Sequence, residues 1–156
     1  PLPTEERSFD QKSTIARYKA NNCEYKLLQH QVNSYRTYLG TLDGNSSIYK
    51  QVNLMIKDYQ LQMNRMDQSF KIQVNKAINN YYVALKKWNA SKSKLSVAEK
   101  RCINANKQFE RGKIPKNQLL KSQVMKEEKE LEYYSYYYKV ALWKYIIENS
   151  IYGAKV

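Results

Sequence analysis

The sequence has little glycine and proline, and this shortage excludes most folds that depend on frequent tight turns. Four glycines and three prolines occur in 156 residues, and all seven lie near the ends of the chain or at two candidate turns. We therefore predict an all-α fold of three helical segments and no strand. No run approaches the eighteen apolar residues of a membrane span, and no signal peptide is recognisable. We expect a soluble piece, either a mature fragment or a trimmed one.

Residues for metal binding and catalysis are also scarce. His30 is the only histidine, and Cys23 and Cys102 have neither a CxxC spacing nor partner histidines. A zinc site or a histidine-dependent triad therefore lacks its ligands. Paired carboxylates and glycine-rich phosphate loops are missing as well. We predict no enzyme, no catalytic residue, no metal and no cofactor, and a packing role for both cysteines.

The sequence does contain one very long helical repeat. No glycine or proline interrupts residues 46–111, which at about 1.5 Å per residue would form a helix roughly 100 Å long. Apolar or small residues recur at alternating steps of three and four, which is typical of a coiled-coil seam. After a polar interval near Ser91 the pattern resumes. The expected seam comprises Val52, Met55, Tyr59, Met63, Met66, Phe70, Val74, Ala77, Tyr81, Leu85, Trp88, Leu95, Ala98, Cys102, Ala105 and Phe109.

A shorter helix is expected before the long one, over residues 4–39. It can begin at Thr4, or at Ser8, where Ser8 and Gln11 offer a capping box. Two stripes follow its length, one mainly of larger side chains and a second, flanking one that is rich in small residues. They consist of Ile15, Tyr18, Asn22, Tyr25, Leu28, Val32, Tyr35 and Leu39, and of Ala16, Ala20, Cys23 and Leu27. Because this apolar surface is broad, we expect the helix to contact neighbouring helices on two sides.

Two turns connect the three helices. Residues 40–45 form the first, after which Asn45 or Ser46 caps the long helix. Residues 112–115 form the second, with Gly112 just past one helix and Pro115 just inside the next. The third helix, over residues 115–152, again has two stripes. They consist of Leu120, Val124, Leu131, Tyr134, Tyr138, Ala141 and Tyr145, and of Tyr133, Tyr137, Val140, Ile147 and Ile151.

These turns predict a long antiparallel coiled-coil hairpin within a single helical domain, residues 1–156. Together the two shorter helices are about as long as the long one, so we expect them to stack end to end beside it. That arrangement keeps Cys23 away from Cys102 and disfavours a disulfide. A pair of helices with two apolar sides each cannot bury all of its apolar surface within one chain. Further copies of the chain beside it, as in a closed barrel of helices, would cover the remaining surface.

Positive charge is concentrated near the second turn. The chain carries a net charge of +13, and residues 86–121 hold eleven cations against Glu99 and Glu110, a net charge of +9. Either these cations form a solvated helix face or they meet an acidic partner. No helix-turn-helix, zinc or RNA-binding signature is present, so we predict no nucleic-acid partner. The cations are Lys86, Lys87, Lys92, Lys94, Lys100, Arg101, Lys107, Arg111, Lys113, Lys116 and Lys121.

Residues 98–123 carry a family resemblance. An aromatic residue, Phe109, stands three positions before a turn glycine, Gly112, and the pair Leu119-Leu120 and the small Ser122 enter the next helix. With this pattern, residues 69–153 resemble the C-terminal half of TolC-type outer-membrane efflux proteins, the exit ducts of multidrug efflux pumps and type I secretion systems. That family also has one long helix flanked by two short ones stacked end to end.

The resemblance implies a segment of a TolC-like α-barrel, a periplasmic tunnel on an outer-membrane channel that conducts exported substrates passively. It places docking of a periplasmic adaptor at Arg111, Gly112 and Lys113, with Phe109 nearby. Leu119, Leu120 and Ser122 would pack the tip and gate helices. An inner-membrane transporter would be an indirect partner, and the full-length protein would be a homo-oligomer, a trimer by family pattern.

The chain departs from this family in two respects. Arg111 and Lys113 stand where apolar or small residues are common, and Gln118 and Lys121 replace acidic ones, which favours an acidic adaptor surface. Between the first two helices the family carries two strands of the outer-membrane β-barrel, where this chain has only residues 40–45. The alternative function is a structural coiled-coil scaffold whose basic end binds an acidic protein or an anionic membrane surface.

Overall fold

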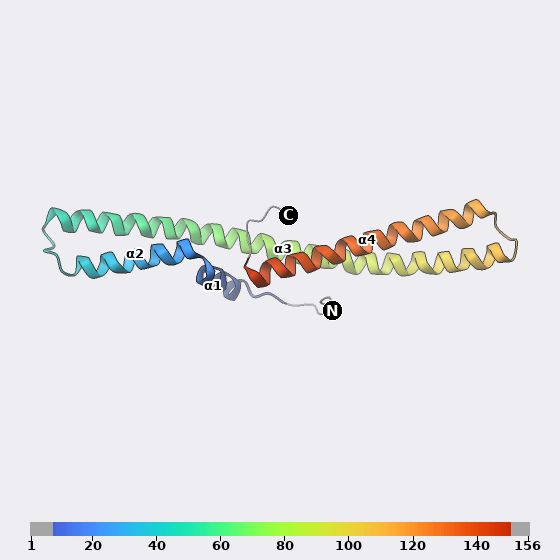
Figure 1. The fold of residues 1–156 in the computed structure, drawn as a ribbon, viewed down its shortest axis with the longest axis horizontal. Helices are drawn as coiled ribbons and strands as arrows, with labels where there is room; N and C mark the ends of the chain where they lie inside the picture. The colour runs from blue at the N-terminus through green and yellow to red at the C-terminus, as the bar shows by residue number, and fades with distance from the viewer. Residues whose placement is uncertain (1–7, 151–156) are drawn as a thin grey trace. The chain divides into compact units, whose positions relative to one another are not determined.

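The computed structural model describes residues 8–150, which form helices joined by turns. The helices are α1 (Gln11–Asn21), α2 (Cys23–Leu39), α3 (Ser47–Glu110) and α4 (Lys116–Asn149) (Figure 1). The prediction of an all-α fold built on one very long helix is confirmed. Both ends of α3 and the start of α4 lie within one residue of the expected bounds, whereas α4 ends at Asn149. The expected continuation through residues 151–152, with Ile151, and the expected start at Thr4 fall outside the described residues.

The described chain divides into two compact units. Residues 78–148 form one, and residues 8–77 form the other, to which Asn149 and Ser150 also belong. The helix α3 contributes its first part to the unit of residues 8–77 and its remainder to the unit of residues 78–148. The end-to-end stacking of the shorter helices stays a prediction.

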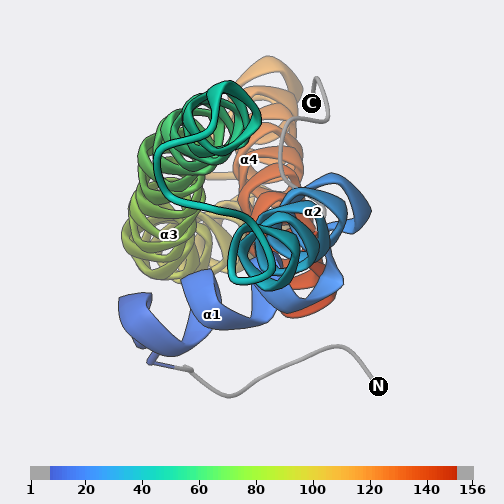
Figure 2. The same cartoon turned by 90° about the vertical axis from the view of Figure 1, so that its left-hand side faces the viewer.

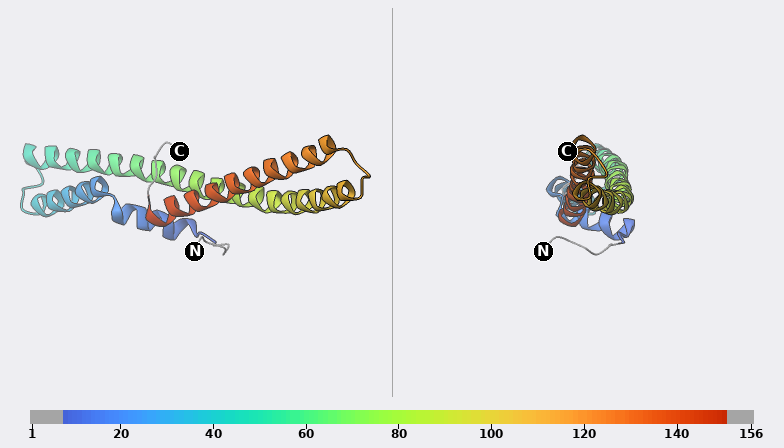
Figure 3. Two further views of the ribbon diagram at one scale, coloured as in Figure 1. Left: turned by 45° about the vertical axis from the view of Figure 1, so that its right-hand side comes forward. Right: turned by 90° about the vertical axis from the view of Figure 1, so that its right-hand side faces the viewer.

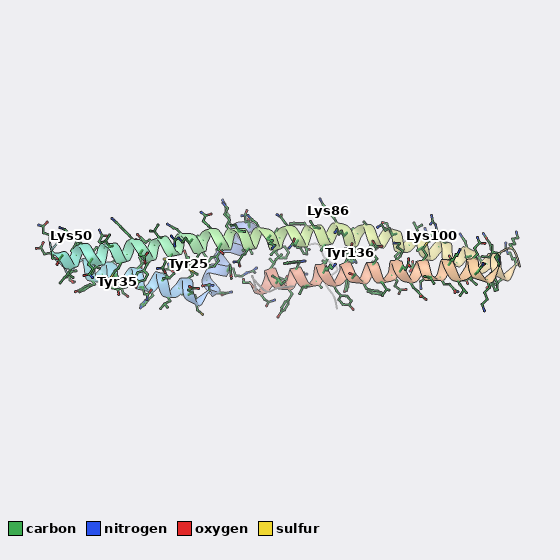
Figure 4. All side chains as sticks on the ribbon, turned by 90° about the horizontal axis from the view of Figure 1, so that it is seen from above. Tyr25, Tyr35, Lys50, Lys86, Lys100 and Tyr136 are labelled. Atoms are coloured by element: carbon green, nitrogen blue, oxygen red, sulfur yellow. The ribbon has the colours of Figure 1, made fainter. Side chains whose placement is uncertain are left out.

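In the unit of residues 8–77, α2 runs back along the first part of α3 (Figures 1 and 4). Val32 of α2 is buried with Val52 and Ile56 of α3. Beside them the rings of Tyr35 and Tyr59 stack with centroids 5.8 Å apart. Since an apolar seam joins the two helices, the antiparallel pairing follows from the sequence repeat.

The first helix is broken, contrary to the expectation of one helix over residues 4–39. Asn22 leaves the helical region, with φ −86° and ψ 114°, and its side-chain oxygen accepts a 2.8 Å hydrogen bond from the Tyr25 N–H. The two consecutive asparagines explain the break, because asparagine favours a cap over a helix interior. Figure 2 shows α1 turned away from the direction of α2.

Beyond the break, α1 still packs on α3. The Tyr18 and Tyr25 rings lie on either side of the break, and their centroids are 4.5 Å and 5.8 Å from that of the buried Phe70. Lys19 Nζ lies 2.7 Å from the Asp67 carboxylate. Partial burial alone would lower the pKa of Lys19, but the hydrogen bond to Asp67 and its charge outweigh that effect and raise it.

The start of α1 also differs from the predicted capping box at Ser8. The N-cap is Asp10, whose carboxylate accepts a 2.7 Å hydrogen bond from the Ser13 N–H and whose carbonyl accepts from the hydroxyl of Thr14. The bonds from Ser13 lower the pKa of Asp10. A charged carboxylate is a stronger acceptor at a helix N-terminus than a serine hydroxyl. The cap expected at Ser46 is confirmed, since its hydroxyl oxygen accepts from the Tyr49 N–H.

The small-residue stripe of the first two helices is uncovered. Ala16, Ala20, Cys23 and Leu27 are all exposed. The packing role predicted for Cys23 is therefore wrong within the described chain, whereas Cys102 is buried as expected. Both thiols are free.

In the unit of residues 78–148, α4 runs antiparallel to the remainder of α3 (Figure 3). Tyr81 of α3 and Ile147 of α4 are almost fully buried. Trp88 lies against the rings of Tyr133 and Tyr137, with centroids 6.1 Å and 5.7 Å away. The polar interval near Ser91 does not interrupt this core. Ser91 is buried, and its hydroxyl donates to the Trp88 carbonyl at 2.7 Å.

Candidate docking site at the Gly112 turn

The turn between α3 and α4 is held by two backbone hydrogen bonds. The Gly112 N–H donates to the Phe109 carbonyl at 2.8 Å, and the Lys113 N–H donates to the Gln108 carbonyl at 2.9 Å. This pair forms a Schellman motif, which requires a left-handed residue just past the helix. Gly112 supplies it with φ +69°. The left-handed backbone conformation therefore explains why the predicted turn residue is a glycine.

The backbone of the Gly112 turn is open to solvent. Arg111, Gly112 and Lys113 are exposed, and a Cβ placed on Gly112 would meet no atom within 4 Å. Phe109, one turn earlier on α3, is 39% exposed. All four residues are accessible to solvent, and the bare backbone of Gly112 stands between two cations in the sequence.

The residues predicted to pack the helix after the turn are divided between two environments. Pro115 immediately precedes α4, and its carbonyl accepts a 3.0 Å hydrogen bond from the Gln118 N–H. Leu119 is buried, Ser122 is half-buried and Leu120 is 48% exposed. Leu119 anchors the start of α4 against its unit, whereas Leu120 faces solvent.

The cations of residues 86–121 are largely unneutralised. Among the described residues, Lys94 is the only one of the eleven in an ion pair, 3.1 Å from Glu132. Lys87 lies 5.7 Å from the centre of the Tyr136 ring, within cation–π range. Figure 4 marks Lys86 and Lys100 along α3 and Tyr136 on α4. The turn therefore lies at the end of a strongly positive helix pair.

Glu132 is shared by two lysines on different helices. It accepts from Lys129 of α4 at 2.9 Å and from Lys94 of α3 at 3.1 Å. These two hydrogen bonds, that from Lys129 first, lower the pKa of Glu132. The carboxylate thus stays ionised and links α3 to α4.

Sequence reasoning missed a groove between α3 and α4. Its volume is about 320 Å³, and it is lined by Ser93, Lys94, Val97, Ala98, Arg101, Met125 and Lys129. Val97 lies next to the seam residue Ala98, and Met125 lies off both stripes assigned to the third helix. The sequence feature that could have indicated this groove is an apolar residue beside the apolar stripe of each helix, flanked by cations.

No cluster of three or more histidine, cysteine, aspartate or glutamate side chains suited to a metal ion occurs among residues 8–150. Within the same range, no helix combines the length and apolarity needed to cross a lipid bilayer. Comparison of the chain with protein-family models, with curated proteins and with solved structures finds no match.

Proposed function

We propose that this chain is a section of the α-helical periplasmic tunnel of an outer-membrane efflux or type I secretion channel. The Gly112 turn would receive the helical hairpin of a periplasmic adaptor, and through it the tunnel would connect to an inner-membrane transporter. Exported substrates would be conducted passively, without a catalytic step. Several copies would be needed to enclose a tunnel, three in the full-length protein.

The observation that carries this proposal is the geometry of the Gly112 turn. Its left-handed glycine has no side chain, a Cβ in that position would meet no atom within 4 Å, and Arg111 and Lys113 stand exposed beside it. A helical partner can therefore contact backbone there at close range. The two flanking cations favour an adaptor tip that carries carboxylates.

The experiment is site-specific photo-crosslinking from position 113 in the cell envelope, with Lys113 replaced by a photoreactive amino acid. Capture of an identified periplasmic adaptor, through its hairpin tip, is the expected result. The matched control places the same amino acid at Asn45, in the exposed turn between α2 and α3. Capture of the adaptor equally from both positions, or of no adaptor from position 113, would overturn docking at this turn.

The second candidate function is a coiled-coil scaffold whose basic end binds an acidic protein or an anionic membrane surface. It is favoured by the ten cations of residues 86–121 that have no ion-pair partner among the described residues. Such binding needs charge but not the Gly112 backbone. Gly112→Leu should therefore weaken adaptor capture while leaving scaffold binding intact, whereas Lys100→Glu with Lys107→Glu should weaken the scaffold contact.

A further inference from the structure

The groove between α3 and α4 has an apolar floor that the described chain leaves uncovered. Val97 and Met125 are 49% and 45% exposed, although the adjacent Ala98 is buried. Lys94, Arg101 and Lys129 surround this floor. Apolar surface framed by charge is the usual anatomy of a protein contact.

The rim of the groove keeps surplus positive charge. Glu132 pairs with both Lys94 and Lys129, so two cations share one carboxylate. Arg101 has no ion pair among residues 8–150. An apolar side chain flanked by carboxylates would therefore complement the groove in both shape and charge.

The same chain presents such a surface on α4. Leu131 is 73% exposed, more than any other large hydrophobic side chain of the described residues. Glu127 and Glu128 lie one turn before it, exposed and without an ion pair in that range. We call Glu127, Glu128 and Leu131 the acidic ridge.

The acidic ridge cannot fill the groove of its own chain. Successive residues of a helix are about 100° apart, so the side chains of Met125 and Leu131 leave α4 about 120° apart. By the same measure Glu127 is about 160° from Met125, whereas Glu128 is about 60° from it and lies between groove and ridge. Leu131 and Glu127 therefore point away from the groove of their own chain, and a second molecule must supply the complement.

We propose that the acidic ridge of one copy docks in the groove of the next. Leu131 covers Val97 and Met125, and Glu127 and Glu128 face Arg101 and Lys94. Since the two surfaces differ, the contact is head-to-tail, and every added copy leaves one groove and one ridge free until a ring closes. This contact lies wholly within residues 78–148 and does not use the Gly112 turn, so it goes beyond adaptor docking.

The first test is disulfide trapping between two separately prepared variants. In a Cys23→Ala background, which removes the exposed thiol, Val97→Cys and Leu131→Cys chains are mixed and oxidised. The mixed dimer should form at least ten-fold more than either like pair. Ile103→Cys is the control, because Ile103 is an equally exposed side chain of α3 outside the groove. It should not trap Leu131→Cys.

The second test reverses charge and measures self-association by sedimentation velocity. Arg101→Glu should weaken association at least ten-fold, and so should Glu127→Arg. The double variant Arg101→Glu with Glu127→Arg should recover it, because these two facing residues again carry opposite charges. Rising salt should weaken the contact of the unmodified chain.

The proposal is overturned by predominant like pairs, by trapping at Ile103, by no recovery in the double variant, or by a chain that stays monomeric at all concentrations. Its fate is separate from that of the adaptor proposal. A failed ridge contact leaves crosslinking from position 113 unchanged, and failure of that crosslink leaves trapping between positions 97 and 131 unchanged.

Discussion

The Lys113 N–H donates to the Gln108 carbonyl across 2.9 Å, and this bond closes over Gly112 at φ +69°. The bond satisfies one of the last carbonyls of α3 and reverses the chain within a few residues. It also leaves the outer side of the turn without side-chain cover at Gly112. The same feature thus ends the long helix and exposes the candidate docking backbone.

Replacing Gly112 by alanine should lower the free energy of unfolding by about 1 kcal/mol, because a side chain in the left-handed region is strained although space is available. Gly112→Asn should lose less, since asparagine tolerates that region. Urea denaturation followed by circular dichroism measures both. Gly44→Ala is the matched control: Gly44 has equal space and no left-handed φ. Equal losses at both glycines would contradict this account of the turn.

The helix break at Asn22 predicts a loss of stability when this residue is replaced. Asn22→Ala removes the acceptor of the Tyr25 N–H, and loss of an N-cap should lower the free energy of unfolding by about 1 kcal/mol. Asn22→Ser and Asn22→Asp should keep most of the stability, because both residues can cap the helix. Asn33→Ala, at an exposed position inside α2, should change little. A gain of stability in Asn22→Ala would contradict a stabilising cap, and an unbroken helix in that variant would show that the cap maintains the break.

The apolar seam of α3 and the stripes of α4 predict which isoleucine side chains stabilise the fold. Ile147 is fully buried, so Ile147→Ala should cost about 2–5 kcal/mol through lost burial and a cavity. Ile103 is 53% exposed, and Ile103→Ala should stay within about 0.5 kcal/mol. Paired urea titrations would give the difference. Similar losses for both would mean that α3 is covered on its outer side in solution.

The sequence repeat located most of this architecture, because a 3.5-residue period fixes which side of a helix is buried. Phe70, Val74, Ala77, Tyr81 and Leu85 are buried as the repeat predicts. Near the start of α3, Val52 is buried as predicted, but Ile56 is buried in place of the predicted Met55, which is 37% exposed. A single helix period cannot choose between adjacent apolar residues when both lie close to the seam.

Other features depended on contacts that a one-dimensional pattern does not contain. The break at Asn22 depends on whether this residue takes a helix-interior or a cap conformation. An ion pair between Lys19 of α1 and Asp67 of α3, which are far apart in the sequence, accompanies the break. The groove combines Val97 and Met125, which come from different helices. At the candidate docking site, the position of Gly112 was predictable from glycine's conformational freedom, whereas the open space around it depends on the three-dimensional fold.

Glu132 gives a pH-dependent prediction. Hydrogen bonds from Lys129 and Lys94 lower its pKa in the folded chain below the value of about 4.3 expected for an unfolded chain. A lowered folded-state pKa means that the unfolded chain binds the proton more tightly. The stabilisation is therefore present above the unfolded pKa and is lost as the pH falls through the folded pKa.

Glu132→Gln removes this contribution, so its deficit in unfolding free energy against the unmodified chain should be largest near pH 7. The deficit should shrink through the acid range and in high salt, because partly exposed pairs are screened. Thermal melts at pH 7, 4 and 3 test this. Glu110→Gln, at an exposed carboxylate with no ion pair among residues 8–150, should show no such trend. A deficit that grows as the pH falls would mean that Glu132 is more stabilising when protonated, which is incompatible with its position between two ammonium groups.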